Sequence, residues 1–93
     1  MPTYQDIIAG IITEEKDTIG ALAIQKAEEV PDLSVDDDGN IKSINGDGEQ
    51  VLGELVEKYE SVVGEAIGST IRHQSKKGDL PDLPENVQKY VHS

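Results

Sequence analysis

The stretch that decides the fold is VLGELVEKYESVVGEAIGSTI, residues 51–71. Its apolar positions are Val51, Leu52, Leu55, Val56, Tyr59, Val62, Val63, Ala66, Ile67, Thr70 and Ile71. This spacing of three and four residues is typical of an amphipathic helix. At 100° per residue the apolar side sweeps roughly 160–200° of the helix circumference, more than the ~100° that faces one neighbour. We therefore predict a long helix that packs against more than one partner.

Residues on either side of this stretch mark the ends of the helix. Asp47 suits the N-cap position, and Gln50, three residues later, completes a capping-box pattern. The two lysines at 76–77 suit the negative end of the helix, and Gly78 suits a stop. We expect the helix to end near His73, where the imidazole makes a favourable contact with the helix dipole.

A second amphipathic segment occupies the N-terminal third of the chain. Thr3 suits the N-cap of this helix, and Pro31 disfavours helix at the residue before it, so the helix should end near residues 28–29. The apolar face consists of Tyr4, Ile7, Ile8, Ile11, Ile12, Ile19, Leu22, Ala23, Ala27 and Val30. We predict one continuous helix of roughly 37 Å. The polar run 13–18 leaves a break in the middle open, and Gly10 and Gly20 each lower helix stability by up to ~1 kcal/mol relative to alanine.

Glu15 is the polar residue that projects onto the apolar face of this N-terminal helix. Burial of an unpaired carboxylate is costly, so we expect Glu15 either to reach solvent or to pair with Lys26 or Arg72. The functional interpretation is a carboxylate within a pocket or a subunit interface. A pocket lined by Glu15, Tyr59 and Arg72 would indicate ligand binding, whereas a filled core would indicate an interaction module.

Two short segments of alternating polarity predict a β-hairpin between the helices. Residues 33–36 and 40–44 flank the turn-forming run Asp37-Asp38-Gly39. An isolated hairpin is marginally stable in water. This one should therefore pack on the helices or pair with a second copy of the chain.

The length of the hairpin loop determines which side chains face the core. A two-residue turn would place Val35 opposite Lys42. A three-residue loop with Gly39 at positive φ, in a G1 bulge, would place Val35 opposite Ile41. The second register collects Leu33, Val35 and Ile41 on one face, so burial favours it.

The C-terminal residues form a proline-containing tail after a single domain over residues 1–78. Within the tail, 79–93, Pro81 and Pro84 keep the first part extended, and Pro84 can open a short helix over 84–91. The apolar side chains of the tail are Leu80, Leu83, Val87, Tyr90 and Val91. They are too many to leave in water, so we expect the tail to dock, on the same chain or on a neighbouring one.

Charge and composition exclude several classes of partner. The formal net charge of −11 opposes binding to nucleic acid and to anionic membranes, because both need Lys and Arg at the contact. The chain has no cysteine, which excludes disulfides and thiolate metal sites. It contains no apolar run long enough to cross a membrane, and its N-terminus lacks the basic region of a signal peptide. We expect a cytoplasmic protein.

The composition also bears on association and on the solvent. The chain has no Phe, no Trp and three Tyr, so a monomer would have a thin core. We expect burial between subunits to supply the rest, as a homodimer. The acidic balance fits either an ordinary acidic protein or a halophilic one, in which molar salt shortens the Debye length to ~3 Å and screens self-repulsion. The seven lysines against one arginine fit the halophilic interpretation less well.

The acidic run at residues 36–40 invites a calcium interpretation, which the spacing does not support. With Gly39 at position six of an EF-hand loop, position one is Ser34 and position twelve is Asn45, so the bidentate Glu is missing. The flanks are strand-like rather than helical. We interpret this run as turn chemistry, with weak surface cation binding as the alternative.

No motif assigns catalytic, cofactor-binding or metal-binding residues. The two histidines, His73 and His92, would need further ligands of unconstrained geometry to hold zinc. Neither G-x-S-x-G nor the P-loop pattern is present. Gly64 and Gly68 would let another backbone approach closely, although chance spacing among nine glycines is the explanation we favour.

Three segments carry a family resemblance: AIQKAEEV at 23–30, LSVDDDG at 33–39 and LVEKYE at 55–60. Across residues 4–73 the chain resembles small acidic haloarchaeal proteins of unknown function. The resemblance implies a halophilic cytoplasm and no assigned activity. It transfers no site residues.

Together these observations predict an α+β fold, a helix–β-hairpin–long helix unit (α-β-β-α) with a short docked tail, paired through its helices as a homodimer. The function we expect is that of a non-enzymatic, self-associating interaction or structural module, with another soluble protein as a further partner. The alternative is a small-ligand or cation-binding regulatory protein.

Overall fold

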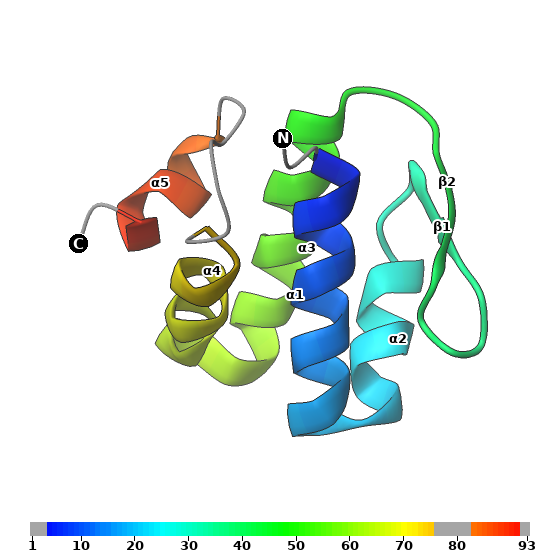
Figure 1. The fold of residues 1–93 in the computed structure, drawn as a ribbon, viewed down its shortest axis with the longest axis horizontal. Coiled ribbons are helices and arrows are strands. Elements are labelled where there is room, and N and C mark those ends of the chain that lie inside the picture. Colours follow the sequence, from blue (N-terminus) through cyan, green and yellow to red (C-terminus); the bar gives the residue numbers. More distant parts are fainter. Residues whose placement is uncertain (1–3, 76–82, 92–93) are drawn as a thin grey trace.

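Five α-helices and one β-hairpin make up the residues that the computed structural model describes, 4–75 and 83–91 (Figure 1). In chain order the elements are α1 (Tyr4–Ile19), α2 (Ala21–Glu28), β1 (Leu33–Val35), β2 (Ile41–Ile44), α3 (Gly48–Val63), the 3-10 turn η1 (Gly64–Ala66), α4 (Ile67–Ser75) and α5 (Glu85–Val91). The predicted α+β class and the order of helix, hairpin and long helix are confirmed.

The core lies around α1 and α3, which pass next to each other through the middle of the molecule (Figure 1). The hairpin and α2 cover one side of this pair, and α4 and α5 cover the other. The largest fully buried side chains are Tyr59, Ile8, Ile11, Ile12, Leu52, Leu55, Ile67 and Ile71. Burying a side chain of this size contributes about 1.5–3 kcal/mol, so aliphatic residues supply most of the hydrophobic stabilisation.

The N-terminal helix is not continuous to residues 28–29, and that prediction is wrong. The helix passes unbroken through the polar run 13–18 and ends at Ile19. Gly20 has φ 64° and ψ −139°, a conformation that only glycine adopts without strain. The chain reverses there, so α2 packs back against α1 and buries Ala23, Ile24 and Ala27.

The helix predicted to run from Asp47 to about His73 is likewise divided in two. The 16-residue helix α3 ends at Val63, and Gly64 takes up φ 61° and ψ −141°, nearly the conformation of Gly20. After the short turn η1, the nine-residue helix α4 begins at Ile67. The apolar spacing of three and four residues continues through this turn, so the spacing did not indicate a break in the helix.

The turn at Gly64 removes the geometric argument for association. Residues 51, 52, 55, 56, 59, 67 and 71 of the apolar stripe are all buried within one chain. Because α4 folds back, two shorter helices present their apolar faces to the same core. The premise that a single chain cannot cover this stripe is therefore wrong for these seven residues, whereas Val62, Val63 and Ala66 at the turn stay exposed or partly exposed and the homodimer itself stays a prediction.

The hairpin has the loop that burial favoured. Val35 lies opposite Ile41, and Gly39 has φ 88°, as the three-residue loop requires. A further register shift leaves Lys42 as an extra residue, so Leu33 faces Ile44 rather than Ser43. The shift keeps four apolar side chains on the face that meets the helices.

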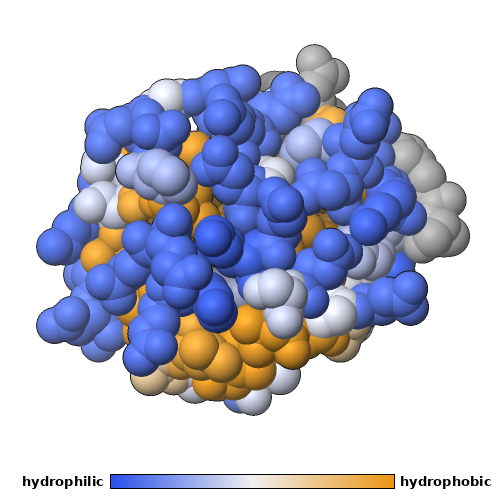
Figure 2. All heavy atoms as spheres, turned by 180° about the vertical axis from the view of Figure 1, so that it is seen from behind, coloured by the Kyte–Doolittle hydropathy of each residue, from blue (hydrophilic) through white to orange (hydrophobic). Residues whose placement is uncertain are grey.

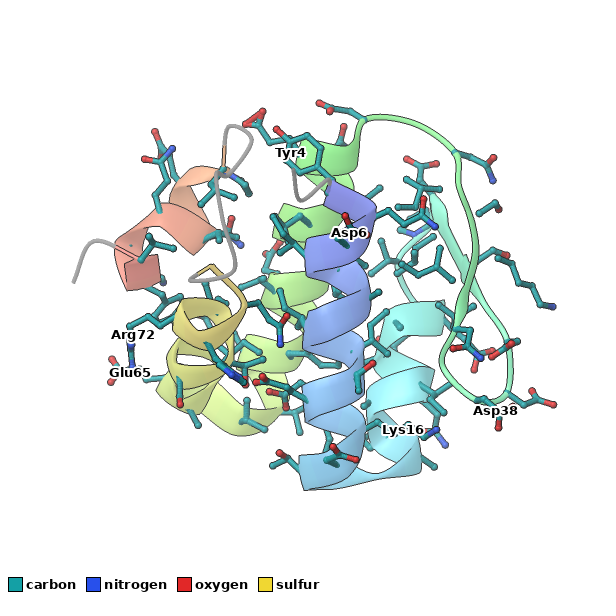
Figure 3. All side chains as sticks on the ribbon, in the orientation of Figure 1. Tyr4, Asp6, Lys16, Asp38, Glu65 and Arg72 are labelled. Atoms are coloured by element: carbon teal, nitrogen blue, oxygen red, sulfur yellow. The ribbon has the colours of Figure 1, made fainter. Side chains whose placement is uncertain are left out.

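The hairpin packs on the helices through its turn. A Cβ atom placed on Gly39 would lie 3.3 Å from Cγ2 of Ile12, and Ile24 is its other near neighbour. Lys16 of α1 donates a hydrogen bond of 2.8 Å to the carbonyl of Asp38 at the hairpin tip (Figure 3). The hairpin is therefore held against α1 and α2 of its own chain.

The predicted N-cap of α3 is confirmed, but the reciprocal half of the capping box is not formed. The Asp47 carboxylate accepts a hydrogen bond of 3.2 Å from the amide of Glu49. Gln50 instead donates from its side-chain amide to Glu54, one turn further along α3.

The helix of the C-terminal tail packs in cis. The helix α5 begins at Glu85, one residue after Pro84, and buries Val87 and Tyr90 against α3 and α4 of the same chain. Leu83, just before it, is buried as well. The predictions for Thr3, Lys76, Lys77, Gly78, Leu80, Pro81 and His92 lie outside the described residues.

Candidate functional site

Glu15 lies on the buried face of α1, as predicted, with a partner that was not predicted. Its residue exposure is 2%, and Oε1 accepts a hydrogen bond of 2.9 Å from the hydroxyl of Thr70 in α4. Lys26 pairs instead with Glu29, and Arg72 donates to the carbonyl of Tyr90 at 3.3 Å. The expectation of a partner is confirmed, whereas both named candidates are wrong.

A second buried polar group, the Tyr59 hydroxyl, lies within the electrostatic reach of Glu15. Burial raises the pKa of Tyr59, and the negative charge of Glu15 raises it further. The hydroxyl donates a hydrogen bond of 2.8 Å to the carbonyl of Ala23, which ties α3 to the first turn of α2. Arg72 is exposed and does not join this group. The pocket of Glu15, Tyr59 and Arg72 that would have indicated ligand binding is not formed by these residues.

The acidic loop of the hairpin is organised by its own backbone. The Asp36 carboxylate accepts hydrogen bonds from the amides of Asp38 and Asn40, both at 2.9 Å, and from the Asn40 side chain at 3.3 Å. The backbone hydrogen bond from Asn40 is the main cause of a lowered pKa at Asp36. These contacts support the interpretation of the run as turn chemistry. Within residues 4–75 and 83–91, no group of three or more His, Asp or Glu is placed to hold a metal ion.

His73 contacts a side chain from another helix. Its Nδ1 lies against Oε1 of Glu14, and Gln74 donates to the same oxygen at 2.7 Å. Both contacts join α4 to α1. Along α4 they lie one turn beyond Thr70, whose hydroxyl is hydrogen-bonded to Glu15. The α1–α4 interface therefore includes hydrogen bonds between side chains, and His73 serves as one of its contacts.

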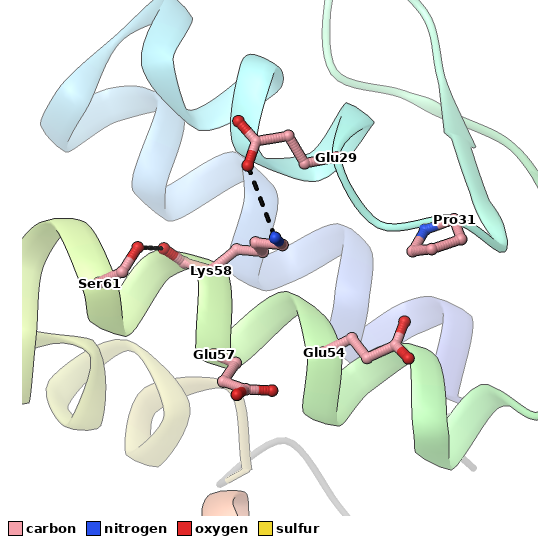
Figure 4. A pocket seen from close by; sticks show the side chains of 6 residues that line it. All are labelled: Glu29, Pro31, Glu54, Glu57, Lys58 and Ser61. Carbon is pink, nitrogen blue, oxygen red and sulfur yellow. Dashed lines mark hydrogen bonds and ion pairs between the residues drawn. The ribbon is translucent and has the colours of Figure 1, made fainter.

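A shallow hollow of about 460 Å³ lies between α2 and α3 (Figure 4). Its lining consists of Glu29, Pro31, Glu54, Glu57, Lys58 and Ser61. The Lys58 ammonium lies 3.7 Å from the Glu29 carboxylate, and the Ser61 hydroxyl donates to the Lys58 carbonyl at 2.6 Å. The hydroxyl therefore faces a backbone acceptor rather than a general base, and this hollow lacks the arrangement that nucleophilic catalysis needs.

The most prominent surface feature of the described residues is a group of exposed and partly exposed apolar side chains. Five residues at the two helix breaks, Ile19, Leu22, Val62, Val63 and Ala66, form what we call the apolar end. Leu22 is 37% exposed, Ala66 is exposed, and the other three are partly exposed. Figure 2 shows hydrophobic residues gathered at this end of the molecule, where α1 gives way to α2 and α3 to α4.

Contacts between α2 and α3 bring the two parts of the apolar end to the same end of the molecule. Ala23, which follows Leu22, accepts the hydrogen bond from Tyr59, and Val62 and Val63 lie one turn further along α3. All five residues were predicted to lie on core-facing stripes, so this surface was not predicted. The sequence feature that could have revealed the apolar end was the glycine next to each stripe. A chain reversal at Gly20 or Gly64 exposes the apolar residues on either side of that glycine.

The two glycines at 64 and 68 do not act together as a contact motif. Gly64 is exposed at the break, and a Cβ atom there would meet nothing within 4 Å. Gly68 is buried, and a Cβ atom there would lie 2.6 Å from Cδ1 of Tyr90. Gly68 therefore makes room for α5, while Gly64 makes the reversal.

Comparison of the chain with protein families, curated proteins and solved structures finds no match. Among the described residues, none of the helices is both long enough and apolar enough to span a lipid bilayer. A functional interpretation of this chain therefore depends on its own residues, and above all on the apolar end.

Proposed function

We propose that this chain is a non-enzymatic, self-associating interaction module that works in a halophilic cytoplasm and pairs with a second copy through its apolar end. The observation that carries the proposal is the exposure of Leu22, the one large apolar side chain among residues 4–75 and 83–91 that is classed as exposed, next to four exposed or partly exposed apolar neighbours. A contiguous exposed apolar patch is typical of a protein contact. The alternative, a ligand-binding regulator, has less support because neither Glu15 nor Tyr59 lines the hollow between α2 and α3.

Electrostatics gives this association a specific salt dependence. Two copies with a formal net charge of −11 repel each other, whereas the five residues of the apolar end carry no charge. Salt screens the repulsion, since the Debye length falls from ~10 Å at 0.1 M to ~3 Å at 1 M. The attraction between apolar surfaces does not weaken with KCl. The dimer should therefore become more stable as the KCl concentration rises, which agrees with the composition and with the haloarchaeal resemblance.

Sedimentation velocity over a range of protein concentrations, at about 0.1 M and about 2 M KCl, tests the proposal. We expect a monomer–dimer equilibrium that shifts toward the dimer in the higher salt. Leu22→Gln should weaken the dimer by more than about tenfold, because the loss of an apolar contact is felt on both sides of a symmetric interface.

A matched pair of substitutions separates the apolar end from general effects on stability. Val62 and Val91 are both partly exposed, on α3 and α5 respectively, and each can be changed to Thr. Val62→Thr should weaken the dimer, and Val91→Thr should leave it unchanged. A protein that stays monomeric at both salt concentrations, or a dimer that dissociates as KCl rises, would refute the proposal.

A further inference from the structure

The apolar stripe of residues 51–71 is uncovered at one place, the break itself. The side chains before it, such as Leu55 and Tyr59, and after it, such as Ile67 and Ile71, are buried. The exposed or partly exposed stripe members are those at the turn, Val62, Val63 and Ala66. In a straight helix, all of these positions would share one face. The sequence therefore retains the pattern of a longer helix that the closed chain does not form.

Gly64 is suited to act as the hinge between the closed chain and a form in which α3 and α4 are one straight helix. Its φ of 61° and ψ of −141° are open to glycine and costly for other residues, whereas helical angles are open to every residue. A Cβ atom at Gly64 would meet nothing within 4 Å, so neighbouring side chains do not hold the turn in place. The hinge residue itself is therefore uncrowded, and straightening would instead have to release the contacts that α4 and α5 make with α1 and α3.

The helices beyond the hinge, α4 and α5, form one unit that contacts the rest of the chain through defined pairs. They are joined to each other by Gly68 and Arg72, which both meet Tyr90. They meet α1 through Thr70 and Glu15, and they meet α3 through a hydrogen bond of 2.9 Å from Asn86 to the carbonyl of Gly53. All of these contacts could form equally well with the same residues of another copy.

We propose that two copies associate by exchanging α4 and α5, with Gly64 straightened so that α3, η1 and α4 become one helix. This inference rests on the proposed self-association and states how it occurs. Each α4–α5 unit then packs on α1 and α3 of the partner copy. The two hinge segments, each carrying Val62, Val63 and Ala66, face each other near the two-fold axis and cover the residues that the closed chain leaves exposed.

The dimensions of the molecule explain why the straight form needs a second copy. A helix over Gly48–Ser75 would be roughly 42 Å long at 1.5 Å per residue. The longest extent of the closed chain is 31 Å. The α4 part would extend beyond its own core and expose Ile67 and Ile71, unless another copy covers them.

Disulfide trapping tests the exchange. Because the chain has no cysteine of its own, any disulfide must form between the introduced residues. A Cβ atom at Gly10 in α1 would lie 3.2 Å from Cγ of Gln74 in α4, so the double variant Gly10→Cys/Gln74→Cys places two thiols within bridging reach. The variant is refolded at high protein concentration in molar KCl, separated into monomer and dimer by size, oxidised and examined under denaturing conditions. In the dimer fraction we expect the disulfide to join two chains, and in the monomer fraction to lie within one.

A control pair on the part that does not exchange calibrates this result. A Cβ atom at Gly48 would lie 2.8 Å from Cβ of Tyr4, so Tyr4→Cys/Gly48→Cys links α1 to α3 once the first turn of α1 moves out by about 1 Å to the usual disulfide separation of about 3.5–4.5 Å. Its disulfide should stay within one chain in both fractions. A dimer in which the bridge between positions 10 and 74 also stays within one chain would overturn the exchange and leave the proposed self-association intact. The absence of any dimer in molar KCl would overturn both.

Gly64→Ala gives a second, independent measurement. Alanine disfavours the closed hinge and favours a straight helix, so the dissociation constant of the dimer should fall by about tenfold or more. Gly20→Ala is the matched control, because Gly20 has nearly the same φ and ψ and equally open surroundings. It should lower the melting temperature without tightening the dimer. A folded Gly64→Ala variant that dimerises no more tightly than the parent would contradict the proposal.

Discussion

Thr70 and Glu15, 55 positions apart in the sequence, share a hydrogen bond of 2.9 Å in the core between α4 and α1. The other carboxylate oxygen of Glu15, Oε2, is also buried and has no hydrogen-bond partner among the described residues. A buried acceptor that lacks a partner costs about 1–3 kcal/mol, and more when it is charged. The hydroxyl of Thr70 is therefore important for holding a carboxylate in this place.

Removal of that hydroxyl should destabilise the protein. We expect Thr70→Val to lower the free energy of unfolding by about 1–3 kcal/mol in urea titrations, since both Glu15 oxygens would then lack a partner. The double variant Glu15→Met/Thr70→Val should recover most of this loss, because an apolar pair needs no hydrogen bond. Thr18→Val, on the exposed side of α1, serves as the control. Additive effects at positions 15 and 70 would argue against the coupling.

Tyr59 should make the protein sensitive to alkali. Because burial, and next the Glu15 charge, raise its pKa in the folded state, the unfolded chain releases the phenolic proton first. The stabilisation is complete below pH ~10 and is lost as the pH rises above that value, by up to ~1.4 kcal/mol per pH unit. We expect Tyr59→Phe to have a smaller slope of unfolding free energy against pH above 10. Equal slopes in the two proteins would show that Tyr59 ionises freely in the fold.

Asp36 should show the opposite dependence in acid. The backbone hydrogen bond from Asn40 is the first cause of its lowered pKa, so the ionised form stabilises the hairpin. This contribution is present above the unfolded pKa of about 3.9 and is lost as the pH falls below it. Hydrogen exchange by NMR, expressed as a protection factor relative to the intrinsic rate at each pH, should show weaker protection of the Asp38 and Asn40 amides in acid. Asp36→Ala should give fast exchange at neutral pH too, and unchanged protection in that variant would contradict the assignment.

Gly68→Ala should destabilise the protein even though alanine is the better helix former. A Cβ atom would lie 2.6 Å from Cδ1 of Tyr90, so α5 would have to shift. Overpacking of this kind costs about 1–3 kcal/mol, which exceeds the gain of up to ~1 kcal/mol in helix propensity. Gly53→Ala, whose nearest contact is 3.3 Å, is the milder comparison. Calorimetry should give a lower melting temperature for Gly68→Ala than for Gly53→Ala. A Gly68→Ala variant more stable than the parent would refute the packing argument.

The features that sequence alone predicted are those decided by nearby residues. The pairing of Val35 with Ile41 follows from the burial pattern and the positive φ of Gly39, both within one hairpin. The cap at Asp47 involves an amide two residues away. The extra residue at Lys42 was not predicted, although it aligns Ile44 with Leu33 and so follows from the same demand for burial.

The helix breaks could not be predicted from periodicity. An apolar rhythm that runs past Gly20 or Gly64 fits a continuous helix as well as two helices that meet one core. The choice between them depends on what α1 and α3 offer as packing surfaces after the chain has folded back. The partner of Glu15 was missed for the same reason, because Thr70 reaches it only through the reversal at Gly64. The apolar end is a product of both reversals, and the two glycines beside the apolar stripes are its only sign in the sequence.

The setting of Tyr59 gives the protein a built-in optical probe. The chain has no tryptophan, so the ultraviolet signal comes from Tyr4, Tyr59 and Tyr90, and only Tyr59 is wholly enclosed and bonded to a backbone carbonyl. A ring held in one asymmetric position dominates the near-ultraviolet circular dichroism. Loss of that band while the far-ultraviolet helical signal persists would mark a loosened, molten interior without any attached dye.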